Sequence, residues 1–214
     1  MLSNSPVVLK GGIVLLDAAS GTVLRIIPLQ YNPESVTRSF QLQAIGTDTA
    51  DRTEAFRLKG PSVETIKVDV ELDATDQLEV VNTTVADVGL QAHLATLELM
   101  IHPTSTQLDA NNSLAGAGTL EILPMEMPLS VFVWSKFRVT PVRLTEFSIT
   151  EQAFDPTLNP IHAKVSLGMR VLNVNDVGFN HKAGRLFMSY LRTKEQLARR
   201  APNGTLAVLG INGI

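Results

Sequence analysis

The chain contains 214 residues, of which 44% are apolar and 18% charged, and its formal net charge is −3. This composition is ordinary for a globular protein, and the charge gives no basic footprint for nucleic acid or an anionic membrane. The absence of cysteine excludes disulfides, thiolate nucleophiles and cysteine metal sites. Because the first residues lack a signal-peptide pattern and no segment approaches ~20 apolar residues, we expect assembly in the cytoplasm without direct membrane insertion.

The N-terminal part is predicted to form four strands. Val7–Leu16 and Val23–Leu29 are rich in β-branched residues and flank a turn, which predicts a hairpin. Ser35–Gln43 is expected to extend again, and the polar residues of Ile45–Lys59 predict a loop. Val63–Leu72 is a clear strand, because apolar and polar residues alternate along it.

The middle of the chain is predicted to contain one long helix. Apolar residues recur at helical spacing through Thr84–Met100, and Pro103 stops the pattern. Thr104–Gly118 is rich in Ser, Asn, Gly and Ala, which predicts a long loop. A short strand, Leu120–Leu123, is expected to follow.

Three further strands are predicted between Pro128 and Leu172. The last has an apolar residue at every second position, which places one continuous stripe on a sheet face: Ile161, Ala163, Val165, Leu167, Met169 and Val171. Beyond it, Gly178–Gly184 is predicted to be a linker and Arg185–Arg200 a basic amphipathic helix. That helix could dock on a partner or an anionic surface, or it could present a solvated face.

These elements predict a mainly β fold with α-helices. Strands on both sides of one long helix, joined by turns, favour an antiparallel β-barrel or sandwich flanked by that helix, with a further C-terminal helix. We expect residues 1–177 to form the β domain and residues 178–214 a helix and tail.

No constellation in the sequence predicts catalysis. Phosphate-binding glycine loops are absent, and His93 and His102 are nine residues apart, so they do not share a helical face as metal ligands. The acidic run from Asp69 to Glu79 matches no calcium loop and is read as a solvated strand end. No serine lies in a nucleophile elbow. We therefore predict no enzyme, no catalytic, cofactor-binding or metal residues, and no cofactor.

Several side chains are candidates for contacts between subunits instead. Trp134 could contact a neighbouring subunit, because aromatic residues are enriched at interfaces, or it could be a core aromatic. Charged side chains could line an outward or lumen-facing sheet surface, although solvated faces explain them nearly as well; the candidates are Arg138, Arg143, Lys164 and Arg170. Asp73 and Asp76, at the end of the acidic strand, complete the candidate set.

Several segments together resemble tube-type baseplate proteins of contractile injection systems, which are phage-tail-like particles. The first is Tyr-Asn-Pro-Glu-Ser at Tyr31–Ser35, followed by Arg-Ser-Phe at Arg38–Phe40. A strand ending in Asp-Ala-Thr-Asp follows at Gly60–Asp76, and then a helix that stops before Pro103. The remaining segments are strands in the family's order: Pro128–Ser135, a Pro-Val-Arg strand, and Ile149–Val165. Members often add a peptidoglycan-binding LysM module, which we do not find here.

The resemblance implies a structural role. Such proteins form homohexameric rings at the baseplate hub, initiating the inner tube between a trimeric spike and the hexameric tube. The implied partners are further copies of the chain, the inner tube protein, the spike protein and other baseplate components, with no nucleic acid. Ile45–Lys59 and Thr104–Gly118 would then be loops that match unlike neighbours above and below. A non-catalytic ligand- or carbohydrate-binding β-sandwich module is the alternative from another class.

Overall fold

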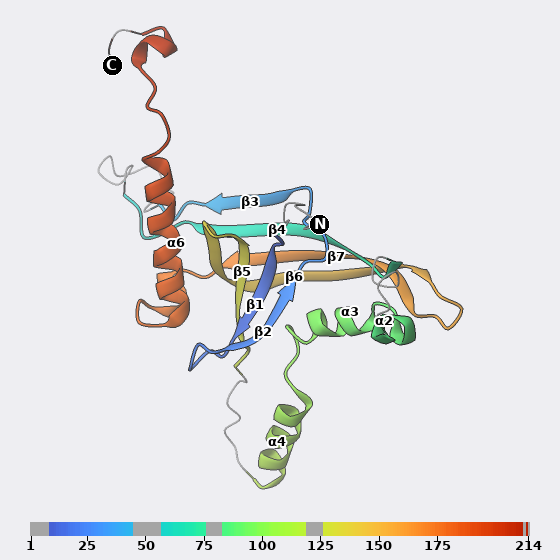
Figure 1. Cartoon of the computed structure of the whole chain (residues 1–214). Coiled ribbons are helices and arrows are strands. Elements are labelled where there is room, and N and C mark those ends of the chain that lie inside the picture. The colour runs from blue at the N-terminus through green and yellow to red at the C-terminus, as the bar shows by residue number, and fades with distance from the viewer. Residues whose placement is uncertain (1–8, 45–56, 76–82, 119–125, 212, 214) are drawn as a thin grey trace, which may run out of the picture.

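A computed structural model describes residues 9–44, 57–75, 83–118, 126–211 and 213 of the chain (Figure 1). Its centre is one seven-stranded antiparallel sheet, with strand order β2-β1-β5-β6-β7-β4-β3. The strands are β1 (Gly12–Leu16), β2 (Val23–Pro28), β3 (Val36–Gln41), β4 (Val63–Asp73), β5 (Leu129–Ser135), β6 (Arg138–Phe154) and β7 (Pro160–Val171). The predicted mainly β fold with α-helices is therefore confirmed.

Helices lie beside and across this sheet. They are α2 (Thr83–Val88), α3 (Gln91–Glu98), α4 (Ser105–Gly116), α5 (Val174–Val177), α6 (Lys182–Ala198) and the short 3-10 helix η1 (Leu206–Leu209). In Figure 1, α6 stands across one end of the sheet, whereas α4 and the C-terminal η1 project away from it in opposite directions.

The predicted alternation explains the strands. In β4 the side chains of Ile66, Val68 and Val70 are buried, whereas those of Lys67 and Asp69 between them are exposed. β7 pairs with β4 in antiparallel register and buries its own apolar stripe on the same face. The hairpins β1–β2, β5–β6 and β6–β7 form where the sequence predicts them.

Two apolar layers stabilise the sheet. On one face, the stripes of β4 and β7 pack with β1 and β2 in the main core. Residues in and next to α3 complete this core: Leu90, Leu94, Leu97 and Met100. On the other face of β1 and β5, a smaller cluster contains Leu16, Leu129, Val131 and Ala183. Because α6 contributes Ala183 to this cluster and Phe187 to the main core, it packs directly on the sheet.

The single helix predicted over Thr84–Met100 is wrong, because the chain forms two short helices there. α2 ends before Gly89, which has a left-handed φ of +57°, and α3 begins only at Gln91. The turn between them is held to the β6–β7 hairpin, since the Leu90 amide donates to the Pro160 carbonyl at 2.9 Å. This tertiary contact breaks a helical pattern that is continuous in the sequence.

Gly89→Ala is expected to destabilise the protein by about 2 kcal/mol or more. A Cβ at this position would lie 2.6 Å from the Pro160 carbonyl oxygen, and a left-handed conformation alone costs a non-glycine residue roughly 1–2 kcal/mol. Urea unfolding measures the loss. Gly116→Ala in α4 is the matched control, because nothing lies near its Cβ position. An equal effect of the two substitutions would contradict the role of Gly89.

The loop predicted over Thr104–Gly118 is also wrong, because residues 105–116 form α4. Thr104 caps this helix: its hydroxyl accepts from the Gln107 amide, while the Gln107 side chain accepts from the Thr104 amide. This reciprocal capping box initiates a helix despite the polar composition. The helix has no buried residue, so its apolar periodicity is too weak to predict it.

The C-terminal helix is confirmed, although it begins earlier than predicted. α6 starts at Lys182, within the predicted Gly178–Gly184 linker, because the His181 side chain accepts from the Ala183 amide and caps it. Residues 45–56 of the predicted first loop and the strand predicted at Leu120–Leu123 lie outside the described residues. The division into residues 1–177 and 178–214 stays a prediction.

Candidate assembly surface

One face of the sheet is polar across β4, β7 and β6. The alternation that buries Ile66 and Val68 turns Lys67, Asp69 and Glu71 to this face. Lys67 Nζ lies 2.8 Å from Glu146 Oε2, and Lys164 Nζ lies 3.1 Å from Glu71 Oε1. The Ser166 hydroxyl donates to Asp69 at 2.6 Å. We name this surface, formed by the outward residues of these three strands, the polar sheet face.

The polar sheet face is chemically suited to contacts with water or a neighbour. Its ion pairs are exposed, and such pairs contribute only ~0.2–1 kcal/mol each to stability. The charges are therefore not needed to hold the sheet together. Positively and negatively charged side chains, spread over several strands, can instead bind a complementary surface or line a water-filled channel.

Four predicted contact residues lie on this polar sheet face. Arg143 of β6 stands directly opposite Arg170 of β7, and Lys164 lies further along the same strand. Arg170 pairs with Asp176 of α5 at 2.8 Å. Asp73 ends β4, where it accepts hydrogen bonds from the Thr75 amide and hydroxyl. Asp76 lies outside the described residues.

The other two predicted residues lie at the β5–β6 hairpin. Trp134 stacks on Phe132, with ring centroids 6.1 Å apart, and packs against the main core. Arg138 begins β6, where it pairs with Ser135 of β5. The structure therefore does not bring these two residues together with Arg143, Lys164 and Arg170. Their contact with a neighbouring subunit stays a prediction.

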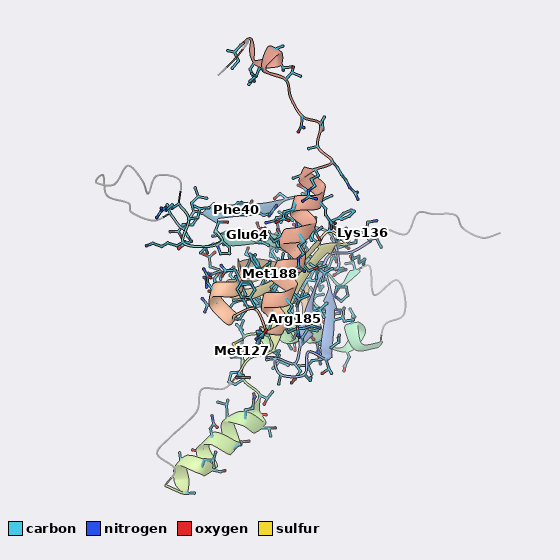
Figure 2. All side chains as sticks on the ribbon, turned by 90° about the vertical axis from the view of Figure 1, so that its left-hand side faces the viewer. Phe40, Glu64, Met127, Lys136, Arg185 and Met188 are labelled. Atoms are coloured by element: carbon cyan, nitrogen blue, oxygen red, sulfur yellow. The ribbon has the colours of Figure 1, made fainter. Side chains whose placement is uncertain are left out.

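A buried carboxylate that the sequence analysis missed connects the sheet to α6. Glu64 is only 3% exposed and stands on the core face of β4. Its carboxylate accepts from Arg38 of β3 at 2.7 Å, and from Lys194 and Tyr190 of α6 at 2.9 and 3.0 Å. Figure 2 shows Glu64 and the neighbouring Phe40 beside α6. We call Glu64, Arg38, Lys194 and Tyr190 the Glu64 cluster.

The electrostatics of the Glu64 cluster favour the ionised carboxylate. Burial raises the pKa of Glu64, but the hydrogen bonds from Arg38 and Lys194 outweigh it and leave this pKa below its ordinary value. Burial, followed by the negative charge of Glu64, raises the pKa of Tyr190. Arg38 and Lys194 also lie over the Phe40 ring, at 5.0 and 5.2 Å from its centroid. The cluster therefore clamps α6 to β3 and β4.

The sequence does contain a signal for Glu64. It precedes Ile66, Val68, Val70 and Leu72 at the same alternating spacing, so the period that predicts their burial predicts its burial too. A carboxylate on a buried stripe requires a cationic or hydrogen-bonding partner. The charged partners, Arg38 and Lys194, are 26 and 130 residues away from Glu64 in the sequence, so no local sequence pattern identifies them.

Acidification is expected to lower the free energy of unfolding over a defined pH range. Glu64 has a lowered pKa, and hydrogen bonds from Asn159 and Thr157 lower the pKa of Asp155 from 3.8 to about 2. Groups whose pKa is depressed by folding stabilise the protein above their unfolded pKa, and this stabilisation is lost as the pH falls through the folded value. The free energy of unfolding should therefore hold steady down to about pH 5 and fall between about pH 4 and 2.

Urea titrations at a series of pH values measure this dependence. Asp155→Asn should flatten the lower part of the curve, because it removes one of the titrating groups. The outward-facing Glu146→Gln should leave the curve unchanged, since Glu146 is exposed. A free energy that does not fall below pH 4 in the unmodified protein would be inconsistent with these pKa shifts.

The two edge strands of the sheet, β2 and β3, form two further surfaces. Within the described part of the chain, β2 pairs only with β1, and β3 only with β4. Large apolar side chains are exposed on these end strands: Val23, Leu24 and Ile26 on β2, and Phe40 on β3. Unpaired strand edges with apolar side chains are templates for pairing with another chain.

Other kinds of site find less support in the described residues. Among them, no group of three or more His, Cys, Asp or Glu side chains could hold a metal ion. None of the helices in the described part is long and apolar enough to cross a membrane. The exposed edges and the polar sheet face are the surface features of the described residues that are available for contacts with another molecule.

Comparisons with known proteins give a limited result. No protein-family model matches the chain, and no curated protein matches it. Among solved structures, the chain is similar to one in the tail of an empty gene transfer agent (GTA) particle with C6 symmetry. The two chains are 13% identical, the match covers 76% of this chain and 90% of that chain, and the TM-score is 0.29. A chain in the virion of a native GTA particle is 11% identical; that match covers 75% of this chain and 90% of the other, with a TM-score of 0.27.

Proposed function

We propose that the chain is a structural component of a contractile, phage-tail-like injection particle. In this role it is a baseplate hub protein that initiates the inner tube and joins the trimeric spike to the hexameric tube. It acts by binding its neighbours and catalyses no reaction. The order of the motifs between Tyr31 and Val165 supports the assignment, because it resembles that of tube-type baseplate proteins.

The observation that carries the proposal is a sheet whose two edge strands each pair with one neighbour only, among the residues that the structure describes. β2 and β3 lie at opposite ends of the strand order and are different surfaces. When two unlike surfaces of identical subunits bind each other, the same contact repeats from one subunit to the next. The subunits form a closed ring if the rotation between neighbours is a whole fraction of 360°. Contacts with neighbouring subunits would cover the apolar edges that a monomer leaves exposed. The polar sheet face would then line the channel or meet the neighbouring ring.

The mass of the assembled protein tests this proposal. Six copies of the 23.2 kDa chain give a ring of about 139 kDa, which mass photometry distinguishes from the monomer. We expect this mass for the chain alone, or a larger mass that includes six copies of the chain after addition of the spike and inner tube proteins of the same particle. A chain that stays monomeric under both conditions, and instead binds a glycan in an array, would support the carbohydrate-binding alternative.

A further inference from the structure

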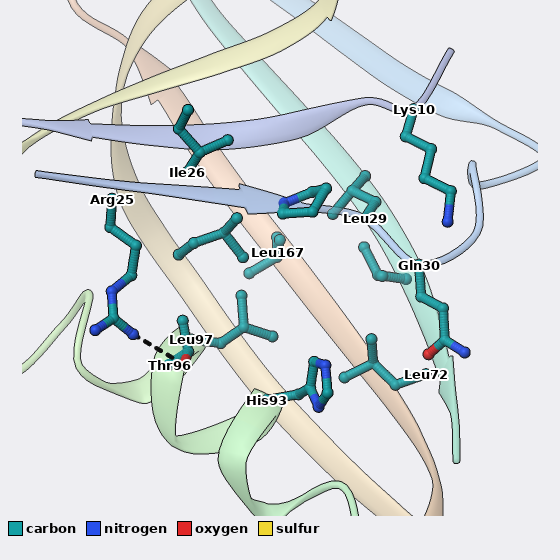
Figure 3. Close-up of a pocket in the computed structure, with 13 residues that line it drawn as sticks. Lys10, Arg25, Ile26, Leu29, Gln30, Leu72, His93, Thr96, Leu97 and Leu167 are labelled. Carbon is teal, nitrogen blue, oxygen red and sulfur yellow. Dashed lines mark hydrogen bonds between the residues drawn. The ribbon is translucent and has the colours of Figure 1, made fainter. Parts of the chain in front are cut away.

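A mainly apolar hollow lies beside β2, between this edge strand and α3. Its walls are formed by the consecutive residues Arg25–Gln30 on one side, and by His93, Thr96 and Leu97 of α3 on the other. Leu72 of β4 and Leu167 of β7 form its apolar floor (Figure 3). Its volume is about 470 Å³, whereas a cavity of about 150 Å³ suffices for a benzene ring. We call this hollow the β2–α3 groove.

The β2–α3 groove is apolar inside and cationic at its ends. Figure 3 shows Lys10 and Arg25 at opposite ends, with Arg25 donating to the Thr96 hydroxyl at 3.1 Å. No carboxylate is among the described residues that line it. The buried Nδ1 atom of His93 has no hydrogen-bond partner within the described part of the chain. A fitting occupant is therefore apolar, carries acidic residues and offers a polar backbone group to His93.

The tip of the β6–β7 hairpin has these properties. Phe154 is 50% exposed and Leu158 77% exposed, and both stand at the tip, beyond the core. Glu151 and Asp155 give the tip negative charge, and no Lys or Arg lies among residues 151–160. In Figure 1 the hairpin reaches past α2.

The tip is also held in a fixed shape. Ala153 and Leu158 have positive φ values of 50° and 67°, a strained conformation that a non-glycine residue keeps only when its surroundings hold it. Asp155 maintains it by accepting from the Thr157 and Asn159 amides, both at 2.8 Å. A rigid apolar tip loses little conformational entropy when it binds, which favours a role in recognition.

The tip cannot fold back into the groove of its own chain. Its base is fixed to the turn between α2 and α3, where Asn159 donates to the Asp87 carbonyl and accepts from the Gln91 side chain, both at 3.1 Å. These bonds add to the one between Leu90 and Pro160. An occupant from the tip must therefore come from another copy.

We propose that the β6–β7 tip of one copy inserts into the β2–α3 groove of a second copy. Phe154 and Leu158 enter the apolar part, Glu151 approaches the cationic rim, and the extended backbone before Phe154 covers the free edge of β2 by strand addition. The inference rests on the proposed function in taking a second copy as the partner. It goes beyond that function by naming the β6–β7 tip as the element of the second copy that covers β2.

Substitutions at the tip test the contact by sedimentation velocity over a concentration series. Phe154→Ser and Leu158→Ser should each raise the concentration needed for self-association at least tenfold. Phe179→Ser is the matched control, because Phe179 is an exposed aromatic residue between α5 and α6 that does not line the groove, and it should change nothing. Unchanged self-association of both tip variants would overturn the inference.

A charge exchange separates this contact from a general loss of stability. Glu151→Lys and Arg25→Glu should each raise the concentration needed for self-association. Combining both substitutions in one chain should lower this concentration again, at least tenfold relative to the single variants. Arg192→Glu on α6 is the control for a changed net charge. A double variant no better than the single variants would overturn the inference while leaving a ring built by other contacts possible. A wild-type chain that never assembles, even with spike and tube proteins, would overturn both proposals.

Discussion

Replacing Glu64 with Gln is expected to lower the free energy of unfolding by about 3 kcal/mol. Removing one partner of a buried ion pair typically costs about 3–5 kcal/mol, because the remaining charge is left uncompensated. Arg38 and Lys194 are 24% and 35% exposed, so solvent compensates part of the loss and the effect should lie at the low end of that range. Urea unfolding at pH 7 measures it.

The matched control is Glu146→Gln on the polar sheet face. Glu146 also pairs with a lysine, at 2.8 Å, but both side chains are more than half exposed. Exposed pairs contribute only ~0.2–1 kcal/mol, so this variant should differ little from the wild type. If Glu64→Gln were as mild as the control, the Glu64 cluster would not be the clamp that holds α6.

Phe187→Ala is expected to destabilise the whole protein by about 3–5 kcal/mol, the usual cost of truncating a buried phenylalanine. Phe187 is buried where α6 meets the main core. Its loss leaves a cavity between the helix and the sheet, which the surrounding structure fills only in part. Differential scanning calorimetry should show one transition, shifted to lower temperature.

This experiment also tests the predicted division at residues 177 and 178. If residues 178–214 were an independent unit, Phe187→Ala would leave the main transition of the sheet unchanged. Leu197→Ala is the control, because Leu197 lies on the same helix but is partly exposed. A small effect of Leu197→Ala beside a large effect of Phe187→Ala would show that α6 is part of the sheet's cooperative unit.

Most of the sheet could be predicted from the sequence, because alternation is a local property. In β4 and β7 each residue's face follows from its position along the strand. Features that depend on distant contacts could not be predicted in this way. Gly89 interrupts a continuous helical pattern only because the turn packs on Pro160.

The candidate surface could be predicted only in part. Lys164, Arg170 and Arg143 share the polar sheet face because strand register places them there. Trp134 carries no signal in its own sequence that distinguishes a core ring from an interface ring, and the structure packs it against the core. The β2–α3 groove arises from β2 and α3, which are far apart in the sequence, so no motif indicates it.

The most direct test of the proposed function is electron microscopy of the chain assembled with the spike and inner tube proteins of the same particle. The proposed role predicts a sixfold ring of this protein between the spike and the first ring of the tube. Spike and tube joined directly, with this protein absent from the junction, would contradict it.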